Sequence, residues 1–134
     1  MDDCIFCKIA NEELPAFKIY DDGQFEAFLD IFPSHKGQAL VIPKKHHTSK
    51  FSQTDTKQLI DLVKVAQKVA RQIEENLSGV DRVQVLIEGF DVDHLHIKLF
   101  PSYGPDAVKD ALSHSGDQAE EDELKQLHDQ LNRT

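Results

Sequence analysis

The chain of 134 residues contains no tryptophan, a single methionine and only two cysteines. Two cysteines are too few for the disulfide framework that stabilises a small secreted domain. No apolar run approaches the roughly 20 residues that a membrane-spanning helix needs, and the acidic residues Asp2 and Asp3 stand where a secretory signal would be basic. These absences lead us to expect a soluble, cytoplasmic protein that does not bind membranes.

Positive charge is also scarce, because 15 basic residues face 24 acidic ones and the net charge is -9. A negative field repels phosphate backbones, so we expect no general binding of nucleic acid. Apolar residues make up 40% and charged residues 29% of the chain, a balance typical of a folded domain. We expect one domain over residues 1–112 and a loose acidic tail over residues 113–134, with a short helix near residues 123–131.

The spacing of apolar residues predicts the secondary structure. Alternation around an Asp-Gly pair predicts a hairpin over residues 17–29, and a short apolar run predicts a strand over residues 38–42. Intervals of three and four predict an amphipathic helix over residues 59–77. Two further runs, residues 82–88 and 94–100, predict a second hairpin. Because strands and helices do not alternate regularly, we expect an α+β fold with the helix packed on an antiparallel sheet.

The run from His94 to Leu99 is the most informative segment. Side chains alternate between the faces of a strand, so His94, His96 and Lys98 share one face and the apolar residues between them face the core. Neighbours on one face lie about 6.6 Å apart, close enough for both rings to serve one pocket. A polar strand edge in contact with water would have the same pattern, and the pattern alone does not decide between the two.

Cys4 and Cys7 form a Cys-x-x-Cys pair. This spacing is that of a zinc knuckle, but a tetrahedral zinc site needs two further ligands. A redox pair and two unliganded thiols are the alternatives, although no strand precedes the pair as it does in thioredoxin-like proteins.

Several motifs in order resemble the histidine triad (HIT) family of nucleotide hydrolases and transferases. The signature of that family is three histidines separated by single apolar residues, which here reads His94-Leu95-His96-Ile97-Lys98. The similarity covers nearly residues 3–101 and includes the segments Cys4–Ile9, Phe28–Ile31, Leu40–His46 and Gly89–His96. The resemblance implies a HIT-like fold, in which one long amphipathic helix packs on a five-stranded antiparallel sheet.

The resemblance assigns the nucleophile to the central histidine, here His96. Histidine has an ordinary pKa of about 6.5, so its neutral ring is suited to attack phosphorus and form a nucleotidyl-histidine intermediate. Lys98 departs from the third histidine of the family. Lysine can place positive charge beside phosphate oxygens, but an ordinary pKa of about 10.4 makes it a poor proton donor at neutral pH. We therefore expect Lys98 to reduce turnover of substrates with basic leaving groups, and Phe90 and Asp91 stand where many members carry Gln and Ser.

The resemblance also implies two binding sites. A nucleotide pocket, in which an aspartate accepts hydrogen bonds from the ribose hydroxyls, takes Ile5, Phe6, Ile9, Phe28, Asp30 and Ile31. A structural zinc ion, as in zinc-binding bacterial members, takes Cys4, Cys7, His46 and His94. By its position beside His46, His47 is either an alternative ligand or a solvated loop residue.

Together these expectations predict an enzyme, a HIT-family nucleotide phosphoramidase. It would cleave purine nucleoside phosphoramidates or related nucleotide conjugates through His96, and it would work as a homodimer. A dinucleoside polyphosphate hydrolase or a nucleotidyltransferase would use the same nucleophile. A nucleotide-binding scaffold with weak catalysis is the third alternative, which the presence of Lys98 favours.

Overall fold

The computed structural model describes residues 3–104, 120–122 and 125. The expected domain boundary at residues 112 and 113 lies outside these residues, and so does nearly all of the expected tail and its helix near residues 123–131. No helix in the described ranges is long and apolar enough to span a membrane.

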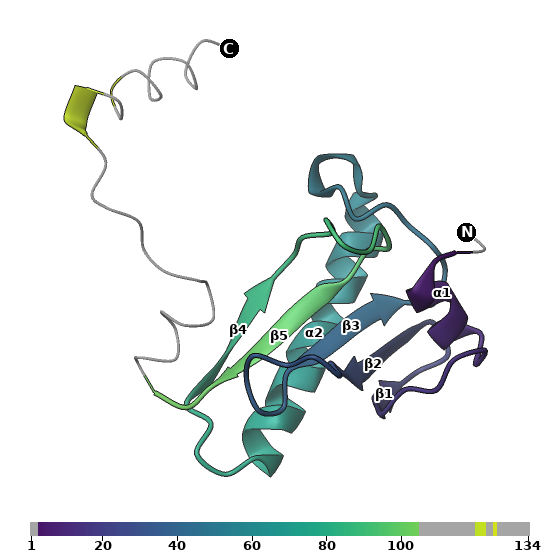
Figure 1. The fold of residues 1–134 in the computed structure, drawn as a ribbon, viewed down its shortest axis with the longest axis horizontal. Coiled ribbons are helices and arrows are strands. Elements are labelled where there is room, and N and C mark those ends of the chain that lie inside the picture. Colours follow the sequence, from purple (N-terminus) through teal and green to yellow (C-terminus); the bar gives the residue numbers. More distant parts are fainter. Residues whose placement is uncertain (1–2, 105–119, 123–124, 126–134) are drawn as a thin grey trace.

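Within the described residues, one antiparallel sheet forms the centre of the molecule (Figure 1). Its strand order is β1-β2-β3-β5-β4. The strands are β1 (Lys18–Asp21), β2 (Phe25–Leu29), β3 (Ala39–Pro43), β4 (Arg82–Leu86) and β5 (Ile97–Ser102). Both predicted hairpins are present, because β1 pairs with β2 and β4 pairs with β5. The five-stranded antiparallel sheet and the α+β class are therefore confirmed.

The long helix α2 (Thr56–Asn76) covers one face of this sheet, and a short 3-10 helix (Phe51–Gln53) precedes it (Figure 1). Asp55 caps α2 by accepting a hydrogen bond from the main-chain N–H of Gln58 at 3.0 Å. The helix starts before the predicted residue 59. The prediction missed this first turn because its residues are polar and do not show the apolar spacing of the rest of the helix. Its apolar stripe packs on odd-numbered strand residues, and each large aliphatic side chain buried there contributes about 2 kcal/mol. This core includes Ala27, Val41, Leu62, Val69 and Leu99.

A second helix, α1 (Ile5–Ala10), lies on the opposite face and was not predicted from the sequence. Cys4 caps it, because Sγ of Cys4 accepts a hydrogen bond from the N–H of Cys7 at 3.4 Å. The buried residues Phe6 and Ile9 pack against even-numbered strand residues, Phe28, Leu40 and Ile42. The two faces of the sheet thus carry two separate apolar clusters, one under each helix.

The second hairpin is shorter than predicted at one end. β4 ends at Leu86 rather than residue 88, and β5 begins at Ile97 rather than residue 94. The backbone before β5 is still held, because the N–H of Leu95 donates to the carbonyl of His47 at 2.8 Å. The predicted alternation continues there: the apolar residues 95, 97 and 99 are fully buried in the cluster under α2, and His94 and His96 contact Phe6 of α1.

Candidate functional site

A cavity of about 600 Å³ opens on the α1 side of the sheet. Its wall is mostly apolar, with a few polar side chains at Asp30, Gln38, Glu88, Asp91, His96 and Lys98. Such a balance is typical of small-molecule sites. The six residues expected to form the nucleotide pocket all line this cavity, together with His96 and Lys98: Ile5, Phe6, Ile9, Phe28, Asp30 and Ile31.

His96 is 2% exposed and lines the cavity. Its Nδ1 lies 2.7 Å from the main-chain oxygen of His94. A carbonyl can only accept, so Nδ1 carries a proton, and in the neutral ring the lone pair lies on Nε2. The edge of the Phe6 ring packs against the imidazole at 83°, with the ring centroids 5.1 Å apart. These two contacts fix the orientation of the imidazole ring.

Lys98 is paired with an acidic side chain that the sequence reasoning missed. Its Nζ lies 2.8 Å from Oε1 of Glu88, and the same oxygen lies 3.6 Å from Nε2 of His96. Oε2 of Glu88 accepts a hydrogen bond from the N–H of Phe90 at 3.0 Å. Burial raises the pKa of Glu88, but the hydrogen bonds from Lys98 and Phe90 outweigh it and bring the pKa below its ordinary value. Glu88 is therefore ionised at neutral pH.

One signal in the sequence could have found Glu88. In the second hairpin Leu86 pairs with Lys98, so residue 88 continues toward the position opposite His96. To derive that register one must know the length of the turn between the two strands, and the sequence pattern did not define this length. Gln38 and Leu14 also line the cavity and were not among the expected pocket residues.

Asp30 is held at the cavity by two hydrogen bonds. Oδ1 accepts from the N–H of Phe32 and Oδ2 accepts from Nε2 of Gln38, both at 2.8 Å. A carboxylate has about four acceptor sites, so both oxygens retain capacity for a ligand hydroxyl. The arrangement presents a fixed pair of acceptors.

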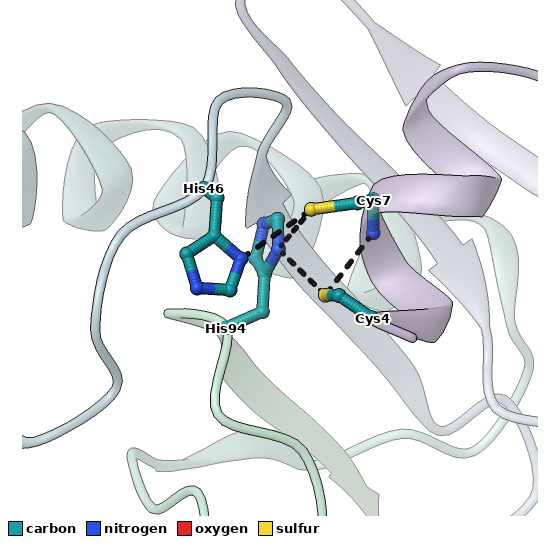
Figure 2. A group of neighbouring side chains, drawn as sticks. All are labelled: Cys4, Cys7, His46 and His94. Carbon is teal, nitrogen blue, oxygen red and sulfur yellow. Dashed lines mark hydrogen bonds between the residues drawn. The ribbon is translucent and has the colours of Figure 1, made fainter. Parts of the chain in front are cut away.

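Four side chains gather beside the cavity to form what we call the Cys2His2 cluster: Cys4, Cys7, His46 and His94 (Figure 2). One ligand atom of each lies within 4.8 Å of the ligand atoms of the others. Sγ of Cys4 lies 3.3 Å from Nδ1 of His94, and Sγ of Cys7 lies 3.3 Å from Nδ1 of His46. Two sulfurs and two imidazole nitrogens are a donor set of structural, tetrahedral zinc sites. The cluster could therefore hold a metal ion.

The surroundings of the Cys2His2 cluster suit a metal. Nε2–H of His94 donates to the carbonyl of Pro43 at 2.8 Å, which leaves Nδ1 free to act as a ligand. Burial lowers the pKa of His94 to about 4, so this ring is neutral near pH 7, as coordination requires. Burial raises the pKa of the Cys7 thiol to about 11, and a bound cation would stabilise the thiolate instead. His47, the alternative ligand, is not part of the cluster in the described residues.

The loop between β4 and β5 is tied to the segment that follows His46. Oδ1 of Asp93 accepts hydrogen bonds from both the N–H and the hydroxyl of Ser49, each at 2.8 Å. Gly89 lies so close to Ser49 that a Cβ at position 89 would overlap the serine side chain. These contacts fix the loop that carries Glu88 and His94.

Fold and site together define a small α+β protein with a buried histidine in an apolar cavity and a candidate metal centre beside it. The HIT domain family model matches residues 11–104, so the chain belongs to the HIT family. The chain is 36% identical over 108 residues to an uncharacterized HIT-like protein of Methanocaldococcus jannaschii. The aligned region covers 77% of this chain and 81% of the relative.

Two further similarities bear on function. The chain is 37% identical over 98 residues to an adenosine 5'-monophosphoramidase of Saccharomyces cerevisiae. The aligned region covers 73% of this chain and 61% of the yeast protein. It also superposes on the crystal structure of a Zn-bound histidine triad family protein from Mycobacterium smegmatis with a TM-score of 0.72, at 32% identity over 78% of each chain. The expected family and the expected HIT-like fold are confirmed.

Proposed function

We propose that this protein is a HIT-family nucleotide hydrolase that cleaves purine nucleoside phosphoramidates or related nucleotide conjugates. The observation that carries the proposal is the orientation of His96 in the cavity, where a carbonyl holds Nδ1–H and thereby leaves Nε2 as the lone-pair nitrogen of the neutral ring. An adenosine 5'-monophosphoramidase among the relatives supports the choice of substrate class.

In the proposed reaction the lone pair on Nε2 of His96 attacks the phosphorus atom. As the P–N bond breaks, its electron pair leaves with the amine nitrogen, which takes a proton from water. Water then attacks the phosphorus of the nucleotidyl-histidine and loses a proton to the solvent. The electron pair of the P–Nε2 bond returns to Nε2, and the nucleoside monophosphate is released. The covalent step divides one difficult displacement into two easier ones.

We propose that the apolar wall holds the base and that Asp30 accepts hydrogen bonds from the ribose hydroxyls. Two carboxylate oxygens in a fixed orientation suit two neighbouring hydroxyl donors. The residues proposed to contact the base are Ile5, Phe6, Ile9, Phe28 and Ile31.

Lys98 is proposed to stand at the third triad position and to place its ammonium near the phosphate oxygens. Its pairing with Glu88 at 2.8 Å leaves less free positive charge there. Compared with a histidine at this position, Lys98 reduces the turnover of substrates with basic leaving groups, because lysine is a poor proton donor near neutral pH. Lys98→His is expected to raise this turnover, and no gain with any phosphoramidate would contradict the assignment.

The Cys2His2 cluster is proposed to hold a structural zinc ion, as in zinc-binding bacterial members of the family. A closed four-ligand site would supply a cross-link between the capped start of α1 and the segment that carries His96, without contacting substrate. Cys4 and Cys7 are free thiols, which is typical of a reducing compartment and supports a cytoplasmic location.

A homodimer is proposed because β4 is an edge strand and has exposed apolar neighbours. β4 pairs only with β5 in the described sheet, so its outer edge is free to meet a second copy. Val85 on β4 is 58% exposed, and Ile60 and Val63 on α2 are 51% and 42% exposed. Sedimentation at several protein concentrations tests this assembly, and Val85→Lys is the matched variant expected to weaken it.

The decisive experiment incubates wild type and His96→Ala with adenosine phosphoramidate and with diadenosine tetraphosphate. We expect wild type to release AMP from the phosphoramidate and to carry an AMP adduct after denaturing quench, with loss of about 10³-fold or more in His96→Ala. Equal rates in both proteins without an adduct would contradict the proposal. Added sugar phosphates as acceptors separate hydrolysis from nucleotidyl transfer.

A nucleotide-binding scaffold is the second candidate, because the Glu88–Lys98 pair leaves the cavity without an unpaired cation among its lining residues. Nucleotide binding without turnover in wild type, unchanged in His96→Ala, would favour this candidate.

A further inference from the structure

The charges that line the cavity are unusual for a site that accepts phosphates. The lining residues include three carboxylates, those of Asp30, Glu88 and Asp91, and one ammonium, that of Lys98. The ammonium is itself matched by Glu88 at 2.8 Å. One phosphate group can interact with Lys98 alongside Glu88. Each additional negative group on the substrate would be repelled, because the carboxylates in the cavity outnumber its ammonium groups.

We propose that Glu88 is a specificity-determining residue that selects substrates by the charge of the leaving group. The inference rests on the proposed function and adds to it. Nucleotide conjugates with a cationic or neutral amine as the leaving group are preferred, and conjugates with an anionic leaving group, such as a polyphosphate, are rejected.

The position of Glu88 explains why this carboxylate dominates. Its Oε1 lies 3.6 Å from Nε2 of His96, the atom proposed to attack phosphorus. In a near-attack arrangement phosphorus lies about 3–3.5 Å from the nucleophile. The substituents on phosphorus therefore fall within about one Debye length of Glu88, which is roughly 8 Å at physiological ionic strength.

Glu88 also keeps its place when Lys98 turns toward a phosphate. Its second oxygen, Oε2, is held by the N–H of Phe90 at 3.0 Å, and the loop is fixed through Gly89 against Ser49. Asp30 is bonded to Phe32 and Gln38 instead. Asp91 is exposed, and no hydrogen bond or ion pair within the described residues joins it to His96 or Lys98.

The size of the effect follows from Coulomb's law. The distal charge of an in-line leaving group lies about 10 Å from Glu88, and a unit charge at that distance from a carboxylate in a partly hydrated site changes the rate constant by about threefold. A cationic and an anionic leaving group differ by two units of charge, so their kcat/KM values should differ by about tenfold.

The test uses three adenosine 5'-phosphoramidates with the same nucleoside and the same P–N bond. Their amines are 1,4-diaminobutane, butylamine and 4-aminobutanoate, which carry a distal positive, no or a negative charge. We expect kcat/KM in wild type to fall in that order. Glu88→Gln should shrink the ratio of the first to the last by about tenfold, and Glu88→Asp should largely keep it. A uniform loss with all three substrates in Glu88→Gln would overturn the inference.

Glu74→Gln is the matched control, because it removes one negative charge from an exposed position on α2 outside the cavity. Its substrate ratio should equal that of wild type. An equal shift in Glu74→Gln and Glu88→Gln would show that net charge of the chain is responsible, and would overturn the assignment to Glu88.

Binding of AMP and ATP to the same proteins separates this inference from the proposed function. Wild type should bind AMP more tightly than ATP, and Glu88→Gln should narrow the difference. Charge-selective binding without turnover of any phosphoramidate would contradict the proposed hydrolysis alone. Turnover with an unchanged substrate ratio in Glu88→Gln would contradict the role of Glu88 alone, and a protein that neither binds nor cleaves these nucleotides would contradict both.

Discussion

The main-chain oxygen of His94 accepts a hydrogen bond from Nδ1 of His96, across 2.7 Å. The side chain of His94 belongs to the Cys2His2 cluster. One residue thus connects the candidate metal centre with the ring that we propose as the nucleophile. A change in the cluster should therefore alter the carbonyl that orients His96, even where the substituted side chain does not line the cavity.

His46→Ala tests this connection, because His46 belongs to the cluster and does not line the cavity. We expect loss of bound zinc and a fall in kcat/KM of at least about tenfold. Metal analysis and phosphoramidate kinetics on the same preparation measure both. His47→Ala is the neighbouring control and should keep metal and activity. Full activity in a zinc-free His46→Ala protein would disprove the connection.

Zinc binding should release protons and weaken as the pH falls. Burial holds the pKa of the Cys7 thiol at about 11, so this group is protonated in the metal-free protein and must lose its proton to bind zinc. His94, with a pKa of about 4, is already neutral and releases none. Calorimetry in buffers of different ionisation enthalpy, between about pH 6 and pH 8, counts the protons. Cys7→Ser should release one proton fewer, and equal counts would refute the explanation.

Gly89→Ala should destabilise the protein by about 1–3 kcal/mol, the usual cost of overpacking. The new Cβ would overlap the side chain of Ser49. Chemical denaturation of wild type and variant gives the free energy of unfolding. Ser49→Gly removes the obstructing atoms, so the double variant should lose less than the sum of the single losses. Simple additivity would show that the clash is not the cause.

Lys18→Met should destabilise the protein because it leaves the carboxylate of Glu26 buried without its cation. Glu26 is 0% exposed, and its Oε2 lies 3.1 Å from Nζ of Lys18. We expect a loss of about 2 kcal/mol, less than for a fully buried pair because the lysine side chain is 27% exposed. Adding Glu26→Leu should restore part of this loss.

The same pair has a defined dependence on pH. The close pairing with Glu26 raises the pKa of Lys18 above its ordinary value. The stabilisation is therefore complete below the ordinary lysine pKa of about 10.4 and is lost as the pH rises through the raised value. Unfolding measured from neutral to alkaline pH should show wild type and Lys18→Met converging, and a constant difference would contradict this account.

The sequence alone was sufficient for the parts of the fold that repeat a period. Alternation around the Asp-Gly turn predicted the pairing of β1 with β2, and intervals of three and four predicted α2. Alternation between residues 94 and 99 correctly predicted that the imidazoles lie on the opposite face of the sheet from the apolar residues packed under α2. The members of the pocket and of the Cys2His2 cluster came from the family resemblance, since they converge from distant segments that no local pattern connects.

Two features, α1 and the role of Glu88, were not predicted from the sequence, because both depend on tertiary contacts. The helix α1 spans six residues, too few to show a helical period, and it is stabilised by the cap at Cys4 and by packing of Phe6 and Ile9. Glu88 is a charged loop residue, which in a sequence is indistinguishable from a solvated one. Only the register of β4 on β5 and the turn at Phe90 bring its carboxylate to Lys98.

The division of residues 94 to 99 between two sides of the sheet restricts how this stretch can change. Exchanging the side chain at position 98 leaves the interior beneath α2 untouched, so selectivity can be retuned by one substitution at little structural cost. Deleting one residue would instead swap the sides, turning leucines toward the ligand and imidazoles into the hydrocarbon interior. The residue at position 98 can therefore change by itself, whereas the length of the stretch cannot.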